Sequence, residues 1–124
     1  MRTKANLRRL GTVHGGYYLV TGIWPVMSLR TFEWVTGPKA DGWLVKTVGL
    51  LAGVIGLSVL RTSTVEGRHP DRALVVGAPL AFAAVDTFYV ARGRIRRVYL
   101  LDAAVELFLA WRWSTGRPEL ELER

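Results

Sequence analysis

The chain has 124 residues, half of them hydrophobic, and carries 17 Lys and Arg against 10 Asp and Glu, for a formal net charge of +7. This length suits one compact core and is too short for two, so we expect residues 1–124 to form a single domain. The hydrophobic content excludes a disordered chain. Because the sequence has no cysteine, disulfide scaffolds, thiol catalysis and cysteine-based metal sites are also excluded.

The apolar residues fall into four blocks, which predict membrane spans at about residues 11–34, 43–60, 73–90 and 98–113. A helix of 18 residues is about 27 Å long, close to the bilayer's hydrocarbon thickness of about 30 Å. A soluble bundle is the alternative, but its helices need a polar face along their whole length. Within residues 48–60 the only polar side chain is Ser58. We therefore predict an all-α, membrane-embedded antiparallel four-helix bundle.

Basic and aromatic residues gather at the ends of these blocks, where lipid headgroups would lie. The loop at residues 92–97 holds four arginines, which anionic headgroups explain without a nucleic-acid partner. Trp34 and Trp43 flank the first loop, and Trp111 and Trp113 close the last span, as interfacial aromatic belts do. The expected partner is therefore the lipid bilayer, and the expected location is the inner (plasma) membrane of a cell, which the chain crosses several times.

The orientation in the membrane follows from the distribution of the basic residues. With four spans both termini share one side, and that side collects ten of the 17 Lys and Arg residues, including those of the polar tail after Trp113. The positive-inside rule then favours cytoplasmic termini. The arginine-rich third loop argues in the opposite direction, so insertion in both orientations stays open.

Charged side chains inside the spans are the main functional signal, because each costs about 2.5–3.5 kcal/mol at a helix centre. Arg30 and Lys46 lie eight residues before and after the midpoint of the first loop. Asp86 and Asp102 lie eight residues before and after the midpoint of the third loop. Both loops would be on the same side of the membrane, so we expect these four side chains at one depth, with Glu33 near the rim.

Glu106 is the sharpest single candidate for a working group. It lies four residues after Asp102, on the same helix face and one turn deeper, where no basic residue of the spans is expected. Two interpretations of the cluster stay open: ion pairs that only lock the helix register, or a polar cavity that binds a cation or another polar ligand. Further side chains expected to line such a cavity are His14, Tyr18, Tyr89 and Tyr99.

Small residues at Gly49, Gly53 and Gly56 have the spacing that permits close helix contact. We expect this face to support a homo-oligomer. No catalytic residue, metal site or cofactor is expected. The two histidines, His14 and His69, lack metal-ligand spacing, and a serine suited to a catalytic triad is not near either of them.

Four segments carry a family resemblance: HGGYY at residues 14–18, GIWP at 22–25, RTFEWVTGPKADGWLVKTVG at 30–49 and YLLDAAVE at 99–106. Together they resemble a group of small bacterial four-span membrane proteins without an assigned function. This resemblance implies a fold and a compartment only. In size and number of spans the chain is also similar to small multidrug transporters, whose first span carries an acidic residue midway. Here the first span has no acid before Glu33, which argues against that function.

Three functional hypotheses follow. The first is a small transporter or ligand-binding membrane protein that uses the charge cluster. The second is a structural or accessory subunit of a membrane complex, whose charges pair internally or with a partner. A membrane enzyme acting on a lipid ranks third, because the sequence contains no evident nucleophile, metal site or cofactor motif.

Overall fold

The computed structural model describes residues 2–65 and 68–115, and over these residues the chain forms five α-helices and no strand. The helices are α1 (Arg2–Met27), α2 (Leu29–Thr36), α3 (Gly42–Thr64), α4 (Arg72–Ala91) and α5 (Tyr99–Thr115). The all-α prediction is therefore confirmed. The polar tail after residue 115, which contributed to the orientation argument, lies outside the described residues.

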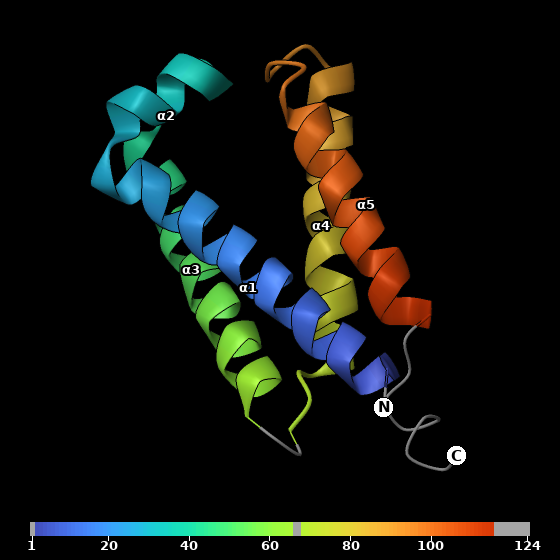
Figure 1. Cartoon of the computed structure of the whole chain (residues 1–124). Helices are drawn as coiled ribbons and strands as arrows, with labels where there is room; N and C mark the ends of the chain where they lie inside the picture. Colours follow the sequence, from blue (N-terminus) through green and yellow to red (C-terminus); the bar gives the residue numbers. More distant parts are fainter. Residues whose placement is uncertain (1, 66–67, 116–124) are drawn as a thin grey trace.

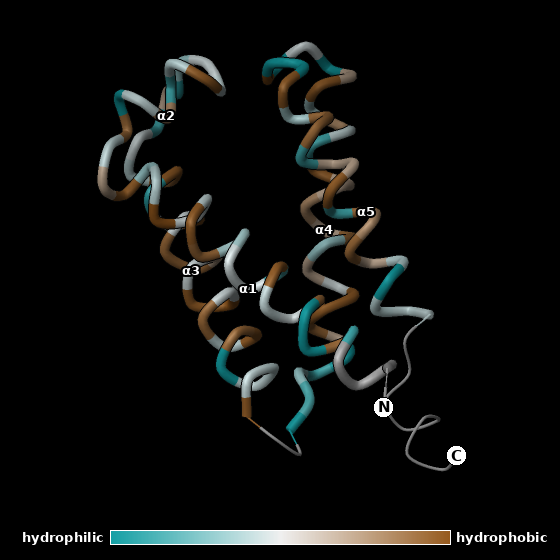
Figure 2. The backbone as a smooth tube through the Cα atoms, viewed as in Figure 1, coloured by the Kyte–Doolittle hydropathy of each residue, from teal (hydrophilic) through white to brown (hydrophobic). Residues whose placement is uncertain are grey.

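The four long helices form two antiparallel pairs, α1 with α3 and α4 with α5 (Figure 1). The pairs meet at the end of the molecule where α1 begins and α5 ends. They separate toward the opposite end, which carries α2 and the loop between α4 and α5. Figure 2 shows hydrophobic residues along the long helices and hydrophilic residues gathered in the loops that join them. The fold is therefore a V whose arms are helix pairs.

A hydrophobic cluster holds the two pairs together at the closed end of the V. Its buried side chains come from α1, α3, α4 and α5, so all four long helices are joined there. Full burial of an aliphatic or aromatic side chain contributes roughly 1.5–3 kcal/mol, so the cluster stabilises the contact of the two pairs at this end. Its members are Leu7, Leu10, Tyr18, Val59, Val75, Leu109 and Trp113.

Glycines bring α1 and α3 into backbone contact. A Cβ atom added to Gly56 would lie 2.6 Å from the carbonyl oxygen of Gly15, and one added to Gly15 would lie 2.7 Å from the carbonyl oxygen of Gly56. The predicted contact face of Gly49, Gly53 and Gly56 is thus real and buried, but it packs against α1 of the same chain. The homo-oligomer expected through this face would need a different surface, because the face is already occupied.

The first apolar block, predicted as one span over residues 11–34, is divided at Ser28. The Ser28 hydroxyl accepts a hydrogen bond from the Thr31 backbone N–H at 3.4 Å and so caps the start of α2. Pro25 lies in the last turn of α1, where it removes one backbone donor. The indole N–H of Trp24 donates to the Thr31 hydroxyl at 2.9 Å and holds the bend. As a result α2 leaves the line of α1 (Figure 1).

Two helices are long and apolar enough to cross a membrane, α3 and α4, with mean hydropathies of 1.9 and 1.8 over 18 residues. Only 22% of each of these windows is buried inside the chain, so most of their apolar surface faces outward. The sequence predicts four such helices. Among the described residues α1 and α5 do not qualify: α5 has only 17 residues, and α1 is long enough but is the least hydrophobic of the four long helices, because its middle contains His14, Tyr17, Tyr18 and several glycines.

Candidate functional site

The separation of the helix pairs leaves a cavity of about 570 Å³ between them. This volume falls in the range of about 300–1,000 Å³ that is typical of small-molecule sites. All five helices contribute to its wall, which is largely apolar and rich in aromatic rings. The aromatic side chains in the wall are Tyr17, Tyr18, Trp24, Phe32, Phe82, Tyr89 and Tyr99.

Three carboxylates line this cavity: Asp86 from α4, and Asp102 and Glu106 from α5. Asp86 is 5% exposed and Glu106 is 1% exposed, while Asp102 is partly buried. The structure therefore brings together the three acidic residues that the sequence placed in two different spans. Burial of a carboxylate is costly unless hydrogen bonds or opposite charges compensate it. The hydrogen-bond partners of each oxygen therefore show which carboxylates are compensated within the protein and which are not.

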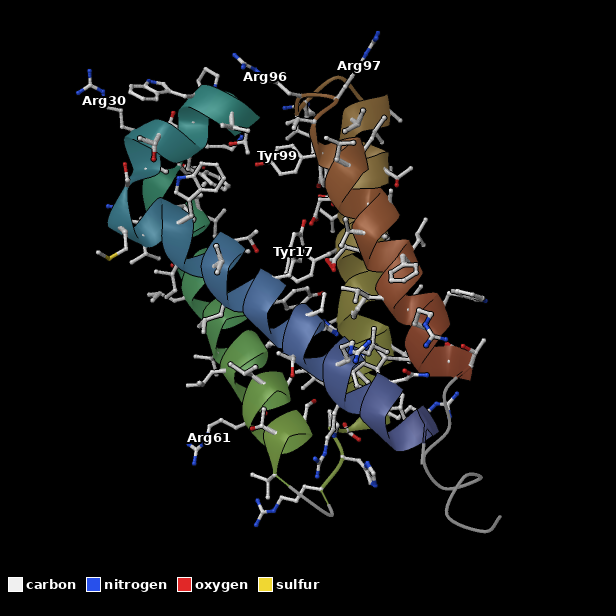
Figure 3. The ribbon with its side chains drawn as sticks, viewed as in Figure 1. Tyr17, Arg30, Arg61, Arg96, Arg97 and Tyr99 are labelled. Carbon is white, nitrogen blue, oxygen red and sulfur yellow. The ribbon has the colours of Figure 1, made fainter. Side chains whose placement is uncertain are left out.

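Two tyrosines of α1 compensate two of the carboxylates. The Tyr18 hydroxyl donates to Glu106, at 2.7 Å from Oε1 and 3.1 Å from Oε2. The Tyr17 hydroxyl donates to Oδ1 of Asp102 at 2.5 Å, and Figure 3 shows Tyr17 in the space between the helix pairs. Both bonds join α1 to α5 and thus one arm of the V to the other.

Asp86 differs from the other two acids. Its Oδ2 atom is buried and has no hydrogen-bond partner among the described residues. Asp86 also lines the cavity, so one residue of this apolar wall carries a buried acceptor without a partner among the described residues. An uncompensated buried acceptor of this kind costs about 1–3 kcal/mol, and a bound ligand with a donor would remove that cost.

His14 lies at the closed end of the V, behind Tyr18, rather than in the cavity wall. It is fully buried, and its Nδ1 atom accepts a hydrogen bond from the indole N–H of Trp113 at 2.9 Å. Its ring packs edge-on against Tyr18, with 4.4 Å between centroids. Trp113, expected at the membrane interface, is instead 4% exposed, because it joins α5 to α1 through this bond.

The basic residues expected beside the carboxylates lie elsewhere. Arg30 is exposed, its guanidinium lies 5.8 Å from the ring centroid of Trp34, and it points away from the space between the helix pairs (Figure 3). Lys46 is exposed on α3 and is not part of the cavity wall. The break at Ser28 explains Arg30, because it places that residue on α2 rather than on the continuing line of α1.

Glu33 also lies outside the cavity wall. One of its carboxylate oxygens accepts the backbone N–H of Lys39 at 3.0 Å and so stabilises the turn between α2 and α3. The basic residue that does line the cavity is Lys39 itself. Its ammonium donates to the Thr36 carbonyl at 3.0 Å and lies 4.9 Å from the ring centroid of Tyr99. Tyr99 and Tyr89, both expected in a cavity wall, lie in it.

Tyr17 and Lys39 are site residues that the sequence interpretation missed. Tyr17 follows His14 by three residues and therefore lies near the same helix face, a spacing that could have indicated its role. Lys39 lies between two apolar blocks of the sequence, and its position in the wall depends on how the turn after α2 folds back. No local sequence signal marks that position.

The open end of the cavity lies between two loops that approach each other. Gly37, at the end of α2, and Gly93, after α4, both have positive φ angles, of 96° and 71°. A Cβ atom added to Gly37 would lie 2.8 Å from Nε of Arg96. Residues of both loops therefore border the entrance, and a smaller cavity of about 200 Å³ lies between them.

Comparisons with protein-family models, with curated proteins and with solved structures find no match to this chain. Within residues 2–65 and 68–115, no group of three or more His, Cys, Asp or Glu side chains is placed to hold a metal ion. The groups that determine the chemistry of the site are three buried or half-buried carboxylates, four tyrosines, one lysine and an apolar wall.

Proposed function

We propose that this protein is a multi-pass integral membrane protein, in which the four long helices form an antiparallel bundle that crosses the inner membrane. Outward-facing apolar side chains support this proposal, among them Leu51 and Val54 of α3 and Leu107 and Phe108 of α5, each at least half exposed. A contiguous apolar surface of this kind is unfavourable in water and favourable in lipid.

The positions of the exposed tryptophans also support a bundle whose two ends lie at the two membrane surfaces. Trp34 and Trp43 are exposed near the open end of the V, and Trp111 is exposed near its closed end. Exposed tryptophans at both ends of a helix bundle are typical of membrane–water interfaces. Arginines also lie at both ends, with Arg96 at the open end and Arg61 at the closed end (Figure 3).

We further propose that the cavity binds a small molecule, so that the protein acts as a small transporter or as a membrane-embedded binding protein. The observation that carries this proposal is Asp86, which lines the apolar cavity and whose Oδ2 atom is buried without a partner among the described residues. If the charged residues served only to fix the helix register, each would be paired with a group of opposite charge. Here Asp102 and Glu106 accept hydrogen bonds from tyrosines, and one oxygen of Asp86 has no partner in the part of the chain that the structure describes.

Cysteine labelling tests the membrane topology. The native chain has no cysteine, so Arg68→Cys and Arg94→Cys each introduce a single thiol, in the α3–α4 and α4–α5 connections respectively. A membrane-impermeant maleimide is expected to label the two variants from opposite sides of sealed membrane vesicles. Labelling of both from the same side would contradict the proposed topology.

A cavity-blocking variant tests the binding function. Val48 lines the cavity, whereas Val54 lies on the same helix, is 65% exposed and is outside the wall. In a thermal-shift screen of purified protein against charged and neutral small molecules, stabilising compounds are expected for the wild type and Val54→Trp and lost for Val48→Trp. The absence of stabilising compounds, or equal shifts for both variants, would contradict the proposal.

An accessory subunit is the second candidate, because the Tyr17–Asp102 and Tyr18–Glu106 bonds also serve to join the helix pairs. Under this alternative the outward apolar surface would contact a partner span. Pull-down from native membranes separates the two: a stoichiometric partner supports the accessory role, and recovery of this chain alone supports the binding protein.

A further inference from the structure

We propose that the ligand of the cavity is an amphiphilic organic cation, an amine or quaternary ammonium or phosphonium group carrying apolar or aromatic substituents. This inference rests on the proposed binding function and adds the chemical class of the ligand. It follows from three features of the cavity: its acidic groups, its aromatic wall and the way in which its single lysine is held.

The acidic groups favour a positively charged ligand. Asp86, Asp102 and Glu106 line one cavity and, when ionised, repel one another in a medium of low dielectric. The hydroxyls of Tyr17 and Tyr18 satisfy oxygens of two of these acids, whereas Oδ2 of Asp86 is buried and has no partner within residues 2–65 and 68–115. A cationic centre bound beside Asp86 would supply the positive charge that the three acids lack, and it would offset the cost of the buried Oδ2 atom.

The wall favours an organic cation over a small hydrated ion. Seven aromatic side chains line the cavity, and most of its remaining wall is aliphatic. Aromatic faces attract cations, by about 0.5–1 kcal/mol at exposed sites and about 2 kcal/mol when water is excluded. The apolar wall would also bury hydrophobic substituents at roughly 25 cal/mol per Å². The volume of about 570 Å³ accommodates a ligand with several such groups.

The one lysine among the described residues of the wall does not neutralise Asp86. The Lys39 ammonium donates to the Thr36 carbonyl and lies over the ring of Tyr99, near the open end. Its charge is thus already compensated by a carbonyl and an aromatic face. The ligand would place its cationic centre at Asp86 and its apolar groups along the aromatic wall between the two helix pairs.

Tetraphenylphosphonium and tetraphenylborate provide the test, because the two ions have nearly the same shape and opposite charges. Each is titrated separately into the full-length protein in nanodiscs, with protein-free nanodiscs as the reference, by isothermal titration calorimetry. We expect saturable binding of the cation and at least tenfold weaker binding of the anion. We also expect Asp86→Asn to weaken cation binding at least tenfold, and Asp71→Asn, which removes an exposed carboxylate outside the wall, to leave it within twofold of wild type.

Equal binding of the two ions to the wild type, or unchanged cation binding by Asp86→Asn, would overturn the inference. The comparison of the two ions needs no variant, so it holds even where Asp86→Asn does not fold. If neutral compounds or the anion bind and Val48→Trp abolishes their binding, the proposed binding function stands and only the ligand class is wrong. If neither ion nor any neutral compound binds, both the ligand class and the binding function fail.

Discussion

The Tyr18 hydroxyl of α1 donates a hydrogen bond of 2.7 Å to Oε1 of Glu106 on α5. Glu106 is 1% exposed, so this tyrosine supplies the compensation that water cannot. The bond lies between the two helix pairs and close to the buried His14 ring. It therefore links the packing at the closed end to the acidic wall of the cavity.

Tyr18→Phe is expected to destabilise the protein by about 1–3 kcal/mol, because the Glu106 carboxylate stays buried and loses its donor. Thermal unfolding of purified protein in detergent measures the loss. Tyr89→Phe is the matched control, since Tyr89 is 43% exposed and its change is expected to have little effect. Equal melting temperatures for Tyr18→Phe and wild type would show that the bond contributes nothing.

Trp113→Phe removes the indole donor to Nδ1 of His14 at the closed end, where both side chains are buried. We expect a lower melting temperature, by an amount that corresponds to about 1–3 kcal/mol for an uncompensated buried acceptor. Trp111→Phe is the control, because Trp111 is 59% exposed on the same helix. A stronger effect at Trp111 than at Trp113 would contradict the assigned role of the buried indole.

Gly15→Ala tests the close packing of α1 on α3. Its Cβ atom would lie 2.7 Å from the Gly56 carbonyl oxygen, so the helices would have to separate. We expect a loss of about 1–3 kcal/mol from overpacking. Gly16 is the neighbouring control: nothing lies within 4 Å of an added Cβ atom there, and Gly16→Ala should stabilise the helix by roughly 0.5–1 kcal/mol. The same sign of change at both positions would contradict this packing.

Most of the helical framework could be predicted from hydropathy and turn residues. The three later apolar blocks correspond to α3, α4 and α5, and the turns at Gly37 and Gly93 fall between helices as their residue types require. The close-contact role of the glycines on α3 also follows from their spacing. What spacing could not show is which helix they contact, because that depends on the matching glycines Gly15 and Gly22 of α1.

The acids expected in one cluster line the same cavity, whereas Arg30 and Lys46 lie outside it. For Arg30 the reason is geometric. Counting residues from a loop midpoint measures depth only if both flanking helices are straight. That condition holds for α4 and α5, which carry Asp86 and Asp102. It fails for the first block, where Ser28 starts a separate helix and takes Arg30 with it. Pro25 interrupts the backbone hydrogen bonding of α1, and Ser28 caps the next helix, so together these two residues mark the break.

The hydrogen bonds between the acids and the tyrosines could not be predicted from the sequence. The bonds from Tyr17 and Tyr18 to α5 span 85 and 88 residues, and they depend on how the two helix pairs meet. A single chain contains no local pattern that specifies this contact. The hydrophobic cluster at the closed end decides it, because it brings Leu10 and Tyr18 of α1 against Leu109 and Trp113 of α5.

Thermal unfolding of Asp86→Asn without added ligand tests most directly whether Asp86 is kept free for a ligand or serves as a structural lock. Because Oδ2 of Asp86 is buried without a partner among the described residues, we expect the neutral variant to melt at the wild-type temperature or above it. Loss of one partner of a buried ion pair costs about 3–5 kcal/mol. A melting temperature lowered to that extent would mean that Asp86 holds the fold together, which contradicts a role in ligand binding.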